Sequence, residues 1–352
     1  MKKRSVGRRI ALWGASALGI LLALVIAFVG YLTITEYKPD AVEPVNVAHA
    51  GTQTPGEQVT LMTYNIGYGG LGAQADFFMD GGADVQPSSK AEVEANLEGV
   101  AQILRENPVD VLFLQEVDLD SKRSYGIDEQ AFLQQSTQMS TAFAYNYNCN
   151  YVPYPLPTIG RVKSGVVTMT NFAVSEATRV SLPVPFSWPV RLCNLKRCLL
   201  VERVALANGK ELVLVNLHLE AYDDGEGKKQ QTEQLMAFLT AEYAKGHYVI
   251  AGGDFNQTFP QNPYPVIDDE NWALGVLDAG MLPEGWQFAV DADAPTCRLL
   301  NKPFSGSYDD TQLYILDGFI VSPNVQVDDV STLDTRFRYT DHNPVKLQVT
   351  LR

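Results

Sequence analysis

Cysteine and histidine are scarce in this sequence, with four of each in 352 residues. Cys193 and Cys198 lie close together, but no second Cys or His pair stands near them, which argues against a structural zinc site. The two cysteines bracket four residues that would suit a hairpin. They are open to two interpretations, a disulfide bridge or a pair of partly buried free thiols.

Positive charge is scarce after the first nine residues. Five basic residues precede the first apolar run, namely Lys2, Lys3, Arg4, Arg8 and Arg9; without them, 22 of the 27 Lys and Arg face 41 Asp and Glu, a formal charge of about −19. Such an acidic chain is poorly suited to nonspecific binding of nucleic-acid backbones, which needs a basic surface. Because 46% of the residues are hydrophobic, the chain can still bury a large globular core.

Only one apolar run, from Ile10 to Ile34, is long enough to cross a bilayer as a helix. The alternative is a cleavable signal peptide, since Ala48-His49-Ala50 resembles a cleavage site. Signal peptides, however, have apolar regions of about 7 to 15 residues that the cleavage site follows closely. The lengths therefore favour a membrane anchor over 10–34. By the positive-inside rule, residues 1–9 form a cytoplasmic tail and everything after Ile34 is extracytoplasmic.

Residues 35–57 hold three prolines and two glycines without a periodic pattern, so we expect an extended linker. From Val59 short apolar runs alternate with amphipathic segments, which indicates one α/β domain over 58–352. Helices are expected after a Ser88 or Ser89 cap and over 228–243. Further strands are expected at 166–172, 199–207, 313–321 and 345–351.

Four apolar runs share one feature, because each stops at a residue able to bind metal, move protons or hold a phosphate. They end at Asn65, Glu116, His218 and Asp254. Open sheets bind ligands beyond their strand ends, so these residues are expected to meet in one crevice.

Short polar motifs add to these strand ends. The string Gly252 to Asn256 contains Asp254 and Asn256, although it would equally suit a simple turn. Thr340 to Pro344 places Asp341 beside His342, one of the four histidines, and a loop before an edge strand is its plainer interpretation. His49 and His247 have no comparable setting.

Taken in order, these motifs resemble the endonuclease/exonuclease/phosphatase superfamily, which includes the pancreatic-type deoxyribonucleases. The resemblance covers about Val59 to Arg352 and implies a four-layer sandwich, with two mixed β-sheets face to face and helices outside. The motifs that carry it are Thr63-Tyr64-Asn65, Gln115-Glu116, Asn216 to Leu219, Gly253 to Asn256, Leu316 to Phe319 and Thr340 to Pro344.

The resemblance also implies a role for each motif. Asn65 and Glu116 would hold magnesium, with Asp341 as a further ligand or a water-mediated contact. Magnesium prefers oxygen ligands and keeps several waters, and manganese fits the same set.

The remaining residues would act on the phosphate and the attacking water. His218 and Asn256 would grip the phosphate, while Asp254 would orient or deprotonate the water. His342, steered by Asp317, would stabilise or protonate the reacting group. Which of Asp254 and His342 is the general base is left open.

Members of this superfamily cleave DNA, RNA, inositol phosphates and sphingolipid headgroups, so the motifs alone select no substrate. An acidic domain tethered at a membrane meets lipid headgroups or small phosphoesters more readily than nucleic acid. We therefore expect an extracytoplasmic hydrolase of a phospholipid headgroup or another small phosphoester. An extracellular nuclease and a noncatalytic phospho-ligand receptor are the alternatives. The loops 67–89 and 145–157 are expected to line the cleft, to touch lipid or simply to pack locally.

Overall fold

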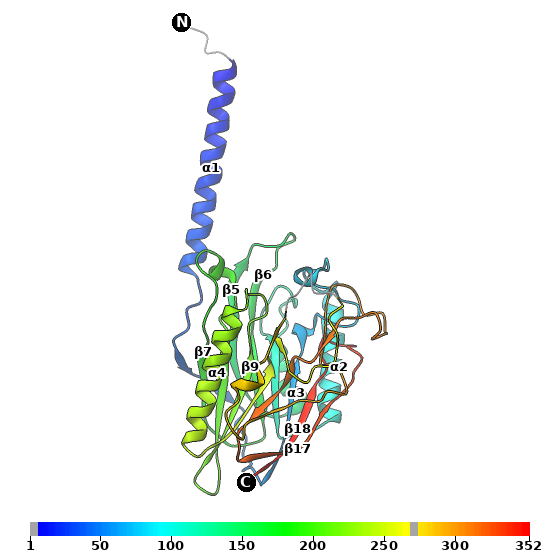
Figure 1. Cartoon of the computed structure of the whole chain (residues 1–352). Helices are drawn as coiled ribbons and strands as arrows, with labels where there is room; N and C mark the ends of the chain where they lie inside the picture. The colour runs from blue at the N-terminus through cyan, green and yellow to red at the C-terminus, as the bar shows by residue number, and fades with distance from the viewer. Residues whose placement is uncertain (1–5, 268–273) are drawn as a thin grey trace.

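The computed structural model describes residues 6–267 and 274–352. Helix α1 (Val6–Ile34) projects away from the rest of the chain (Figure 1). By length and composition it is able to cross a membrane, which agrees with the apolar run expected over 10–34. Lys2, Lys3 and Arg4 of the expected cytoplasmic tail lie outside the described residues.

Two mixed β-sheets form the centre of the domain, each with seven strands in the described part of the chain. In spatial order, the first sheet consists of β1 (Val42–Pro44), β7 (Val174–Ser181), β8 (Cys198–Ala205), β9 (Glu211–His218), β10 (Tyr248–Asp254), β16 (Asp317–Val321) and β13 (Gln287–Ala289). The second consists of β17 (Val325–Thr332), β18 (Val345–Leu351), β3 (Gln58–Asn65), β4 (Val111–Asp118), β6 (Gly160–Thr170), β5 (Ser140–Val152) and β2 (Val47–Ala48).

Short elements complete the domain around these sheets. Two small strand pairs join β11 (Gln257–Thr258) to β12 (Gly275–Val276) and β14 (Cys297–Arg298) to β15 (Leu313–Tyr314). Single 3-10 turns are η1 (Gly67–Gly69), η2 (Phe78–Asp80), η3 (Val190–Cys193) and η4 (Ala279–Met281).

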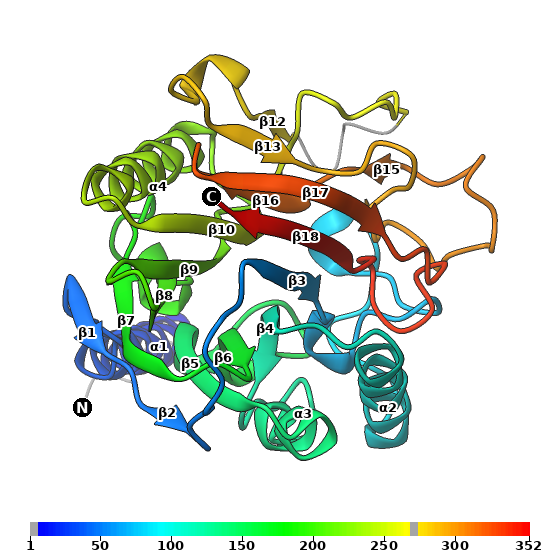
Figure 2. The same cartoon turned by 90° about the horizontal axis from the view of Figure 1, so that it is seen from below.

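Helices cover the outer faces of both sheets, which completes the expected four layers (Figure 2). Helix α4 (Glu226–Ala244) packs Leu235 and Leu239 on the first sheet, while α2 (Lys90–Glu106) packs Val93 and Leu97 on the second. Helix α3 (Glu129–Thr137), which the sequence pattern did not predict, lies beside α2. Between the sheets lies a core with inward-facing side chains from both, such as those of β3, β4, β9 and β10.

The cap predicted for α2 is present. Ser89 accepts a hydrogen bond from the backbone nitrogen of Glu92 at 3.2 Å, and the inward face holds the predicted apolar residues. A cap of this kind contributes about 1 kcal/mol to helix stability. The second predicted helix, over 228–243, corresponds to α4.

The segment expected to be an extended linker pairs with both sheets through two short strands. Its strand β1 pairs with β7 at the edge of the first sheet, and β2 pairs with β5 at the edge of the second. Gln53 also forms a bridge with Phe172. Residues 35–57 therefore pair with an edge strand of each sheet. The edge strands offer unpaired backbone N–H and C=O groups, and an extended segment beside them can form hydrogen bonds with these groups.

A bridge between Cys193 and Cys198 is not formed, and all four cysteines are free thiols within the described residues. Alternation along β8 turns Cys198 inward, where its sulfur lies 3.1 Å from Asn146 Oδ1. Cys193 lies in η3, and its sulfur is 3.6 Å from the carbonyl oxygen of Tyr151. The two thiols thus face different surroundings.

Candidate active site

Polar residues occupy one end of the core between the sheets. Strands β3 and β4 are parallel, as are β9 and β10, so their carboxyl ends lie at the same edge of each sheet. Leu61 and Ile250 belong to the core between the sheets, and the period-two pattern puts Asn65 and Asp254 on the same face. His218 ends β9 directly opposite Asp254 in the register.

Glu116 departs from this regular pattern. A β-bulge interrupts the pairing of β4 with β6 between Leu114 and Val117, and Glu116 adopts a positive φ of 55°. A non-glycine residue rarely adopts this conformation, which costs about 1–3 kcal/mol. The bulge re-aims the carboxylate toward the end of the core, where its oxygen lies 3.4 Å from Asn65 Nδ2.

Asp254 is at the centre of the polar cluster. Its Oδ2 accepts a hydrogen bond from Asn65 Nδ2 at 3.0 Å and lies 3.5 Å from His218 Nε2 and 3.7 Å from His342 Nε2. Its Oδ1 accepts from the backbone nitrogen of Asn256 at 2.9 Å. Every predicted group that could handle a proton or a phosphate is therefore within reach of this carboxylate.

Burial raises the pKa of Asp254 to about 6, and the neighbouring charge of Asp317 adds to the shift. His342 and the donors Asn65 and Asn256 act in the opposite direction. A carboxylate with this pKa is mostly ionised at neutral pH yet accepts a proton more readily than an ordinary Asp.

Asn256 also has a positive φ, of 49°, directly after β10. Its Nδ2 donates to the carbonyl oxygen of Leu219 at 2.8 Å, which fixes the side chain beside Asp254. Gly253, three residues earlier in β10, has a φ of 150°. A Cβ at this position would lie 1.9 Å from the carbonyl oxygen of Leu217. Only glycine allows this strand end to approach β9 so closely.

His342 and Asp317 form a tight pair. Asp317 begins β16 opposite Asp254, and its Oδ2 lies 2.8 Å from His342 Nδ1. Burial disfavours the charged ring, but Asp317, together with Cys297 and Asp341, outweighs it and raises the pKa of His342 well above its ordinary value. The imidazole is thus held as a cation whose Nε2 faces the site.

His218 has the opposite tendency. Burial and the positive charge of Arg197 lower its pKa well below the ordinary value, and His342 adds to this effect. A neutral imidazole and a cationic one therefore both lie within 3.7 Å of Asp254 Oδ2. The two histidines thus differ in protonation state, as acid–base catalysis requires of groups with different roles.

Of the expected metal ligands, Asp341 is buried and Glu116 is half-buried at the cavity. Burial raises the pKa of each; Arg123 opposes the shift at Glu116, whereas the charge of Asp341 adds to it. Two neighbouring carboxylates of like charge are stabilised by a cation between them, and oxygen ligands suit magnesium or manganese. The residues present thus fit a hard divalent cation.

Asn65 does not yet present its oxygen to this site. Its Oδ1 accepts a hydrogen bond from the backbone nitrogen of Gly67 at 3.0 Å, while Nδ2 faces Glu116 and Asp254. A half-turn of the amide would exchange the two atoms and place the oxygen beside Glu116. Ligation by Asn65 requires that turn.

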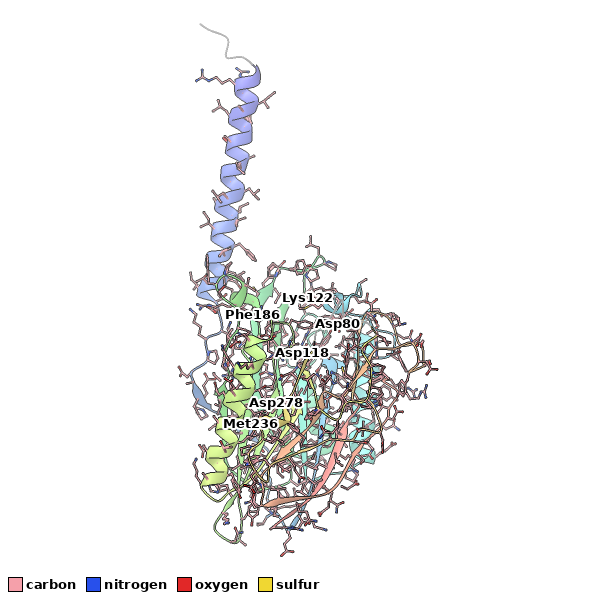
Figure 3. The ribbon with its side chains drawn as sticks, in the orientation of Figure 1. Asp80, Asp118, Lys122, Phe186, Met236 and Asp278 are labelled. Atoms are coloured by element: carbon pink, nitrogen blue, oxygen red, sulfur yellow. The ribbon has the colours of Figure 1, made fainter. Side chains whose placement is uncertain are left out.

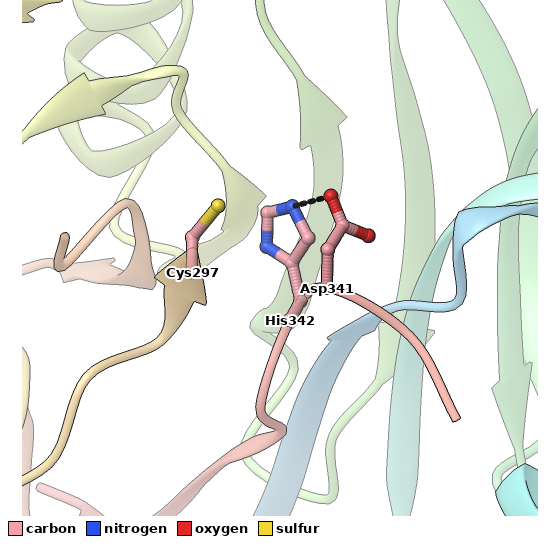
Figure 4. Close-up of side chains that lie close together, drawn as sticks. All are labelled: Cys297, Asp341 and His342. Carbon is pink, nitrogen blue, oxygen red and sulfur yellow. Dashed lines mark ion pairs between the residues drawn. The ribbon is translucent and has the colours of Figure 1, made fainter. Parts of the chain in front are cut away.

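Two other groups of side chains are compact enough to hold a metal ion. One comprises Cys297, Asp341 and His342 (Figure 4), and the other comprises Asp254, Asp317 and His342. In both, His342 Nδ1 is already engaged by Asp317, and its Nε2 lies 3.8 Å from Asp341 Oδ2. This leaves Nε2 as the ring nitrogen that faces the site.

Several residues of the site were not anticipated. Arg123 makes two hydrogen bonds to Asp118, at 3.0 and 3.1 Å, and its guanidinium lies 3.7 Å above the ring of Tyr68. Arg197 lies behind His218. Both arginines line the cavity, and nothing in their local sequence distinguishes them from surface arginines.

A cavity of about 240 Å³ opens over these groups. Six of the eight residues expected at the site line it: Glu116, His218, Asp254, Asn256, Asp341 and His342. Asn65 and Asp317 lie behind this layer, each hydrogen-bonded to a residue of the lining. Apolar side chains also line the cavity, among them Leu71, Phe77 and Phe186.

The comparisons with known proteins agree with this geometry. A sequence profile described as the Endonuclease/Exonuclease/phosphatase family matches residues 62–342. No curated protein gives a significant match. The fold is similar to that of an endonuclease/exonuclease/phosphatase from Beutenbergia cavernae, with a TM-score of 0.56 at 17% identity over 84% of this chain and 72% of that one.

Two further solved structures are similar. One is an endonuclease/exonuclease/phosphatase from Bacteroides vulgatus, with a TM-score of 0.52 at 16% identity, over 84% of this chain and 99% of that chain. The other is D. rerio TDP2 complexed with a single-strand DNA product, with a TM-score of 0.50 at 15% identity, over 83% of this chain and 99% of that chain. At these identities the structures show the shared fold, and the profile shows the family. The chain belongs to the endonuclease/exonuclease/phosphatase family, whose members are metal-dependent phosphoesterases.

Proposed function

We propose that this protein hydrolyses a phosphoester by attack of water at phosphorus, with Mg²⁺ or Mn²⁺ held by Glu116 and Asp341 and by Asn65 after its amide turns. The single observation that carries the proposal is the arrangement around Asp254. Its Oδ2 lies 3.5 Å from Nε2 of a neutral His218 and 3.7 Å from Nε2 of a cationic His342. The bound cation would supply a positive charge that polarises the phosphoryl oxygens.

The pKa values favour Asp254 as the general base. It is mostly ionised at neutral pH and takes the proton of the attacking water, whereas the cationic His342 has no free pair to accept one. His342 Nε2 instead donates to the phosphoryl group as negative charge grows there. His218 and Asn256 hold the phosphate in line with the water.

Location and charge favour a phospholipid headgroup or another small phosphoester as the substrate. The chain after residue 9 is strongly acidic, and α1 has the length and composition of a membrane anchor. With the basic residues in the cytoplasm, the catalytic domain lies on the extracytoplasmic side. An extracellular nuclease is the second candidate, since D. rerio TDP2, which shares the fold, was solved with a single-strand DNA product.

The proposal is tested by phosphate and headgroup release from the full-length protein in detergent with magnesium. The panel contains phospholipid vesicles, inositol phosphates and single-stranded DNA, beside the matched variants Asp254→Asn and His342→Gln. Turnover of lipid or small esters that both variants lose would support the proposal. Cleavage of DNA alone would make the protein a nuclease, and ligand binding without any turnover would make it a receptor.

The proposed topology has its own test. Protease added to intact cells should remove the domain from 58 to 352 and leave a fragment that contains α1. Full protection of the domain would contradict the extracytoplasmic placement. Secretion of a chain that begins after Ala50 would identify residues 1–50 as a cleaved signal sequence.

A further inference from the structure

The cavity opens at the end of the domain from which α1 projects. Figure 3 shows Asp80 and Phe186, two lining residues, at this end, with Met236 farther from the helix. The connection between β5 and β6 also rises here to the level of the last turns of α1 (Figure 1). The catalytic cleft thus faces the side on which a membrane containing α1 would lie.

Two loops at this end expose large apolar side chains and carry no charge. They are residues 151–158, with the sequence YVPYPLPT, and residues 182–190, with the sequence LPVPFSWPV. We call these two loops, together with Met79, the apolar rim. Leu156 is 85% exposed and Tyr154 is 70% exposed, in a domain whose surface is otherwise strongly acidic. The other large apolar side chains exposed on the rim are Met79, Tyr151, Val184, Trp188 and Val190.

The rim is continuous with the cleft. Met79 and Phe186 line the cavity, as does Ile159 directly after the first loop. The ring of Tyr154 lies 6.0 Å from that of Phe78, so the first loop packs on the turn that carries Met79. A molecule entering the cavity from this side passes between apolar side chains.

Helix α1 is fixed to the rim by specific contacts. The ring of Phe28 lies 5.9 Å from that of Tyr151, and Trp188 Nε1 donates to Thr33 Oγ1 at 3.3 Å. Just beyond the helix, the buried carboxylate of Glu36 lies 3.2 Å from Arg191 Nε. The helix therefore has a set orientation on the rim.

These contacts determine how deep the rim lies. At 1.5 Å per residue α1 is roughly 44 Å long, close to the 40–45 Å of a bilayer with its headgroups. Trp13 and Tyr31 are then roughly 27 Å apart, which suits the two aromatic belts of a membrane. Along the helix axis, Phe28 lies roughly 8 Å farther from the domain than Thr33, and so deeper in the membrane. Tyr151, which contacts Phe28, and Trp188, which contacts Thr33, therefore span the outer headgroup layer.

We propose that the apolar rim is seated in the outer interface of the bilayer that holds α1, so that the cleft takes a phosphoester lipid directly from that leaflet. Exposed aromatic and aliphatic side chains without charge are those that partition into this interface. The second half of the proposal rests on the proposed phosphoesterase activity. The first half does not.

Local contact with lipid tests the seating without any assay of activity. The full-length protein is reconstituted into vesicles of phosphatidylcholine and phosphatidylglycerol that contain a diazirine-bearing phosphatidylcholine, and cross-linked peptides are mapped by mass spectrometry. Lipid adducts are expected on peptides that contain residues 151–158 and 182–190. The internal control is the turn 206–210, which joins β8 to β9 at the end of the domain away from the apolar rim. Adducts on the rim no more frequent than on that turn would overturn the seating.

Rim variants test the delivery of substrate. Leu156→Glu combined with Val190→Glu places two charges on exposed rim positions, and Val276→Glu places one on a similarly exposed valine outside the rim. The rim variant should hydrolyse vesicle phospholipid roughly tenfold more slowly, given the cost of a charge at the interface. Its hydrolysis of soluble bis(p-nitrophenyl) phosphate should equal that of the wild type, and the Val276→Glu protein should be normal in both assays.

The outcomes separate the two proposals. Undiminished hydrolysis of vesicle lipid by the rim variant would overturn delivery from the leaflet. A wild-type protein that forms rim adducts but hydrolyses neither of these substrates nor any ester of the panel above would refute the phosphoesterase proposal and leave the seating intact. Leu156→Phe, which keeps the apolar character, should retain both adducts and lipid turnover.

Discussion

His342 Nδ1 lies 2.8 Å from Asp317 Oδ2; both side chains are buried, and Asp317 lies behind the cavity lining to which His342 belongs. The carboxylate fixes the ring so that Nε2 faces Asp254 and Asp341, and it contributes to keeping the imidazole charged. In the proposed mechanism, Asp317 thereby sets both the direction and the protonation state of the histidine that faces the phosphoryl group.

The first prediction concerns this pair. Asp317→Asn should lower kcat by roughly 10²- to 10⁴-fold with little change in KM, because the neutral amide no longer supports the imidazolium, as in other His–carboxylate pairs. The pKa of His342 should fall, which NMR titration of the ring protons measures. A merely structural role would change the melting temperature and leave that pKa where it was.

The second prediction concerns the metal. Magnesium should stabilise the wild-type protein by about 2–3 kcal/mol at a hundredfold excess over its dissociation constant, a shift of roughly 5–10 °C in melting temperature. Glu116→Gln should remove most of this shift while the metal-free protein becomes no less stable, because one of two repelling carboxylates is gone. Glu98→Gln, an exposed position on α2, is the control. An equal shift in all three proteins would refute the assignment of Glu116.

Much of the site was predictable because it lies at strand ends. Asn65, His218 and Asp254 each end an apolar run, and the alternation of β-strands puts them on one face. Parallel pairing then brings the carboxyl ends of these strands together. The position of these residues could therefore be predicted without knowing the tertiary contacts.

Other features depend on tertiary contacts that local sequence does not encode. Strand β1 contains Pro44 and has no apolar period, and it becomes a strand only because the edge of β7 is available. Arg123 belongs to the site because Asp118 and Tyr68 hold it there. Asp118 is near in sequence but forms no recognisable motif with Arg123, and Tyr68 comes from a distant segment. The bulge that turns Glu116 inward leaves no signature in the apolar run before it.

The third prediction concerns the cysteines. Cys193 makes a thiol hydrogen bond with Cys149, which lowers the pKa of Cys149 to about 7, whereas Cys198 faces Asn146. Glutathione disulfide should therefore oxidise Cys149 and Cys193 to a bridge, with release of two glutathiones. Mass spectrometry of unreduced peptides identifies the pair. A bridge between Cys193 and Cys198 would contradict the arrangement of η3 and β8.

The fourth prediction concerns Glu202, a buried acid in β8. Its side chain shares a face with Leu200 and Val204 between the sheets, and burial raises its pKa to about 8. The folded state thus binds this proton more tightly than the unfolded state, where the pKa is about 4.5. The stability due to neutral Glu202 is fully present below about pH 4.5 and is lost as the pH rises through about 8.

Glu202→Gln keeps the shape of the side chain without a titrating proton. Its advantage in unfolding free energy over the wild type should therefore grow between pH 5 and pH 9, by an amount on the order of several kcal/mol. Urea unfolding at a series of pH values measures this difference. Glu176→Gln, at an exposed position on the neighbouring strand β7, is the control for replacing a surface glutamate. A constant difference for Glu202→Gln would mean that Glu202 is ionised in the folded protein, and hence that a cation or water reaches it between the sheets.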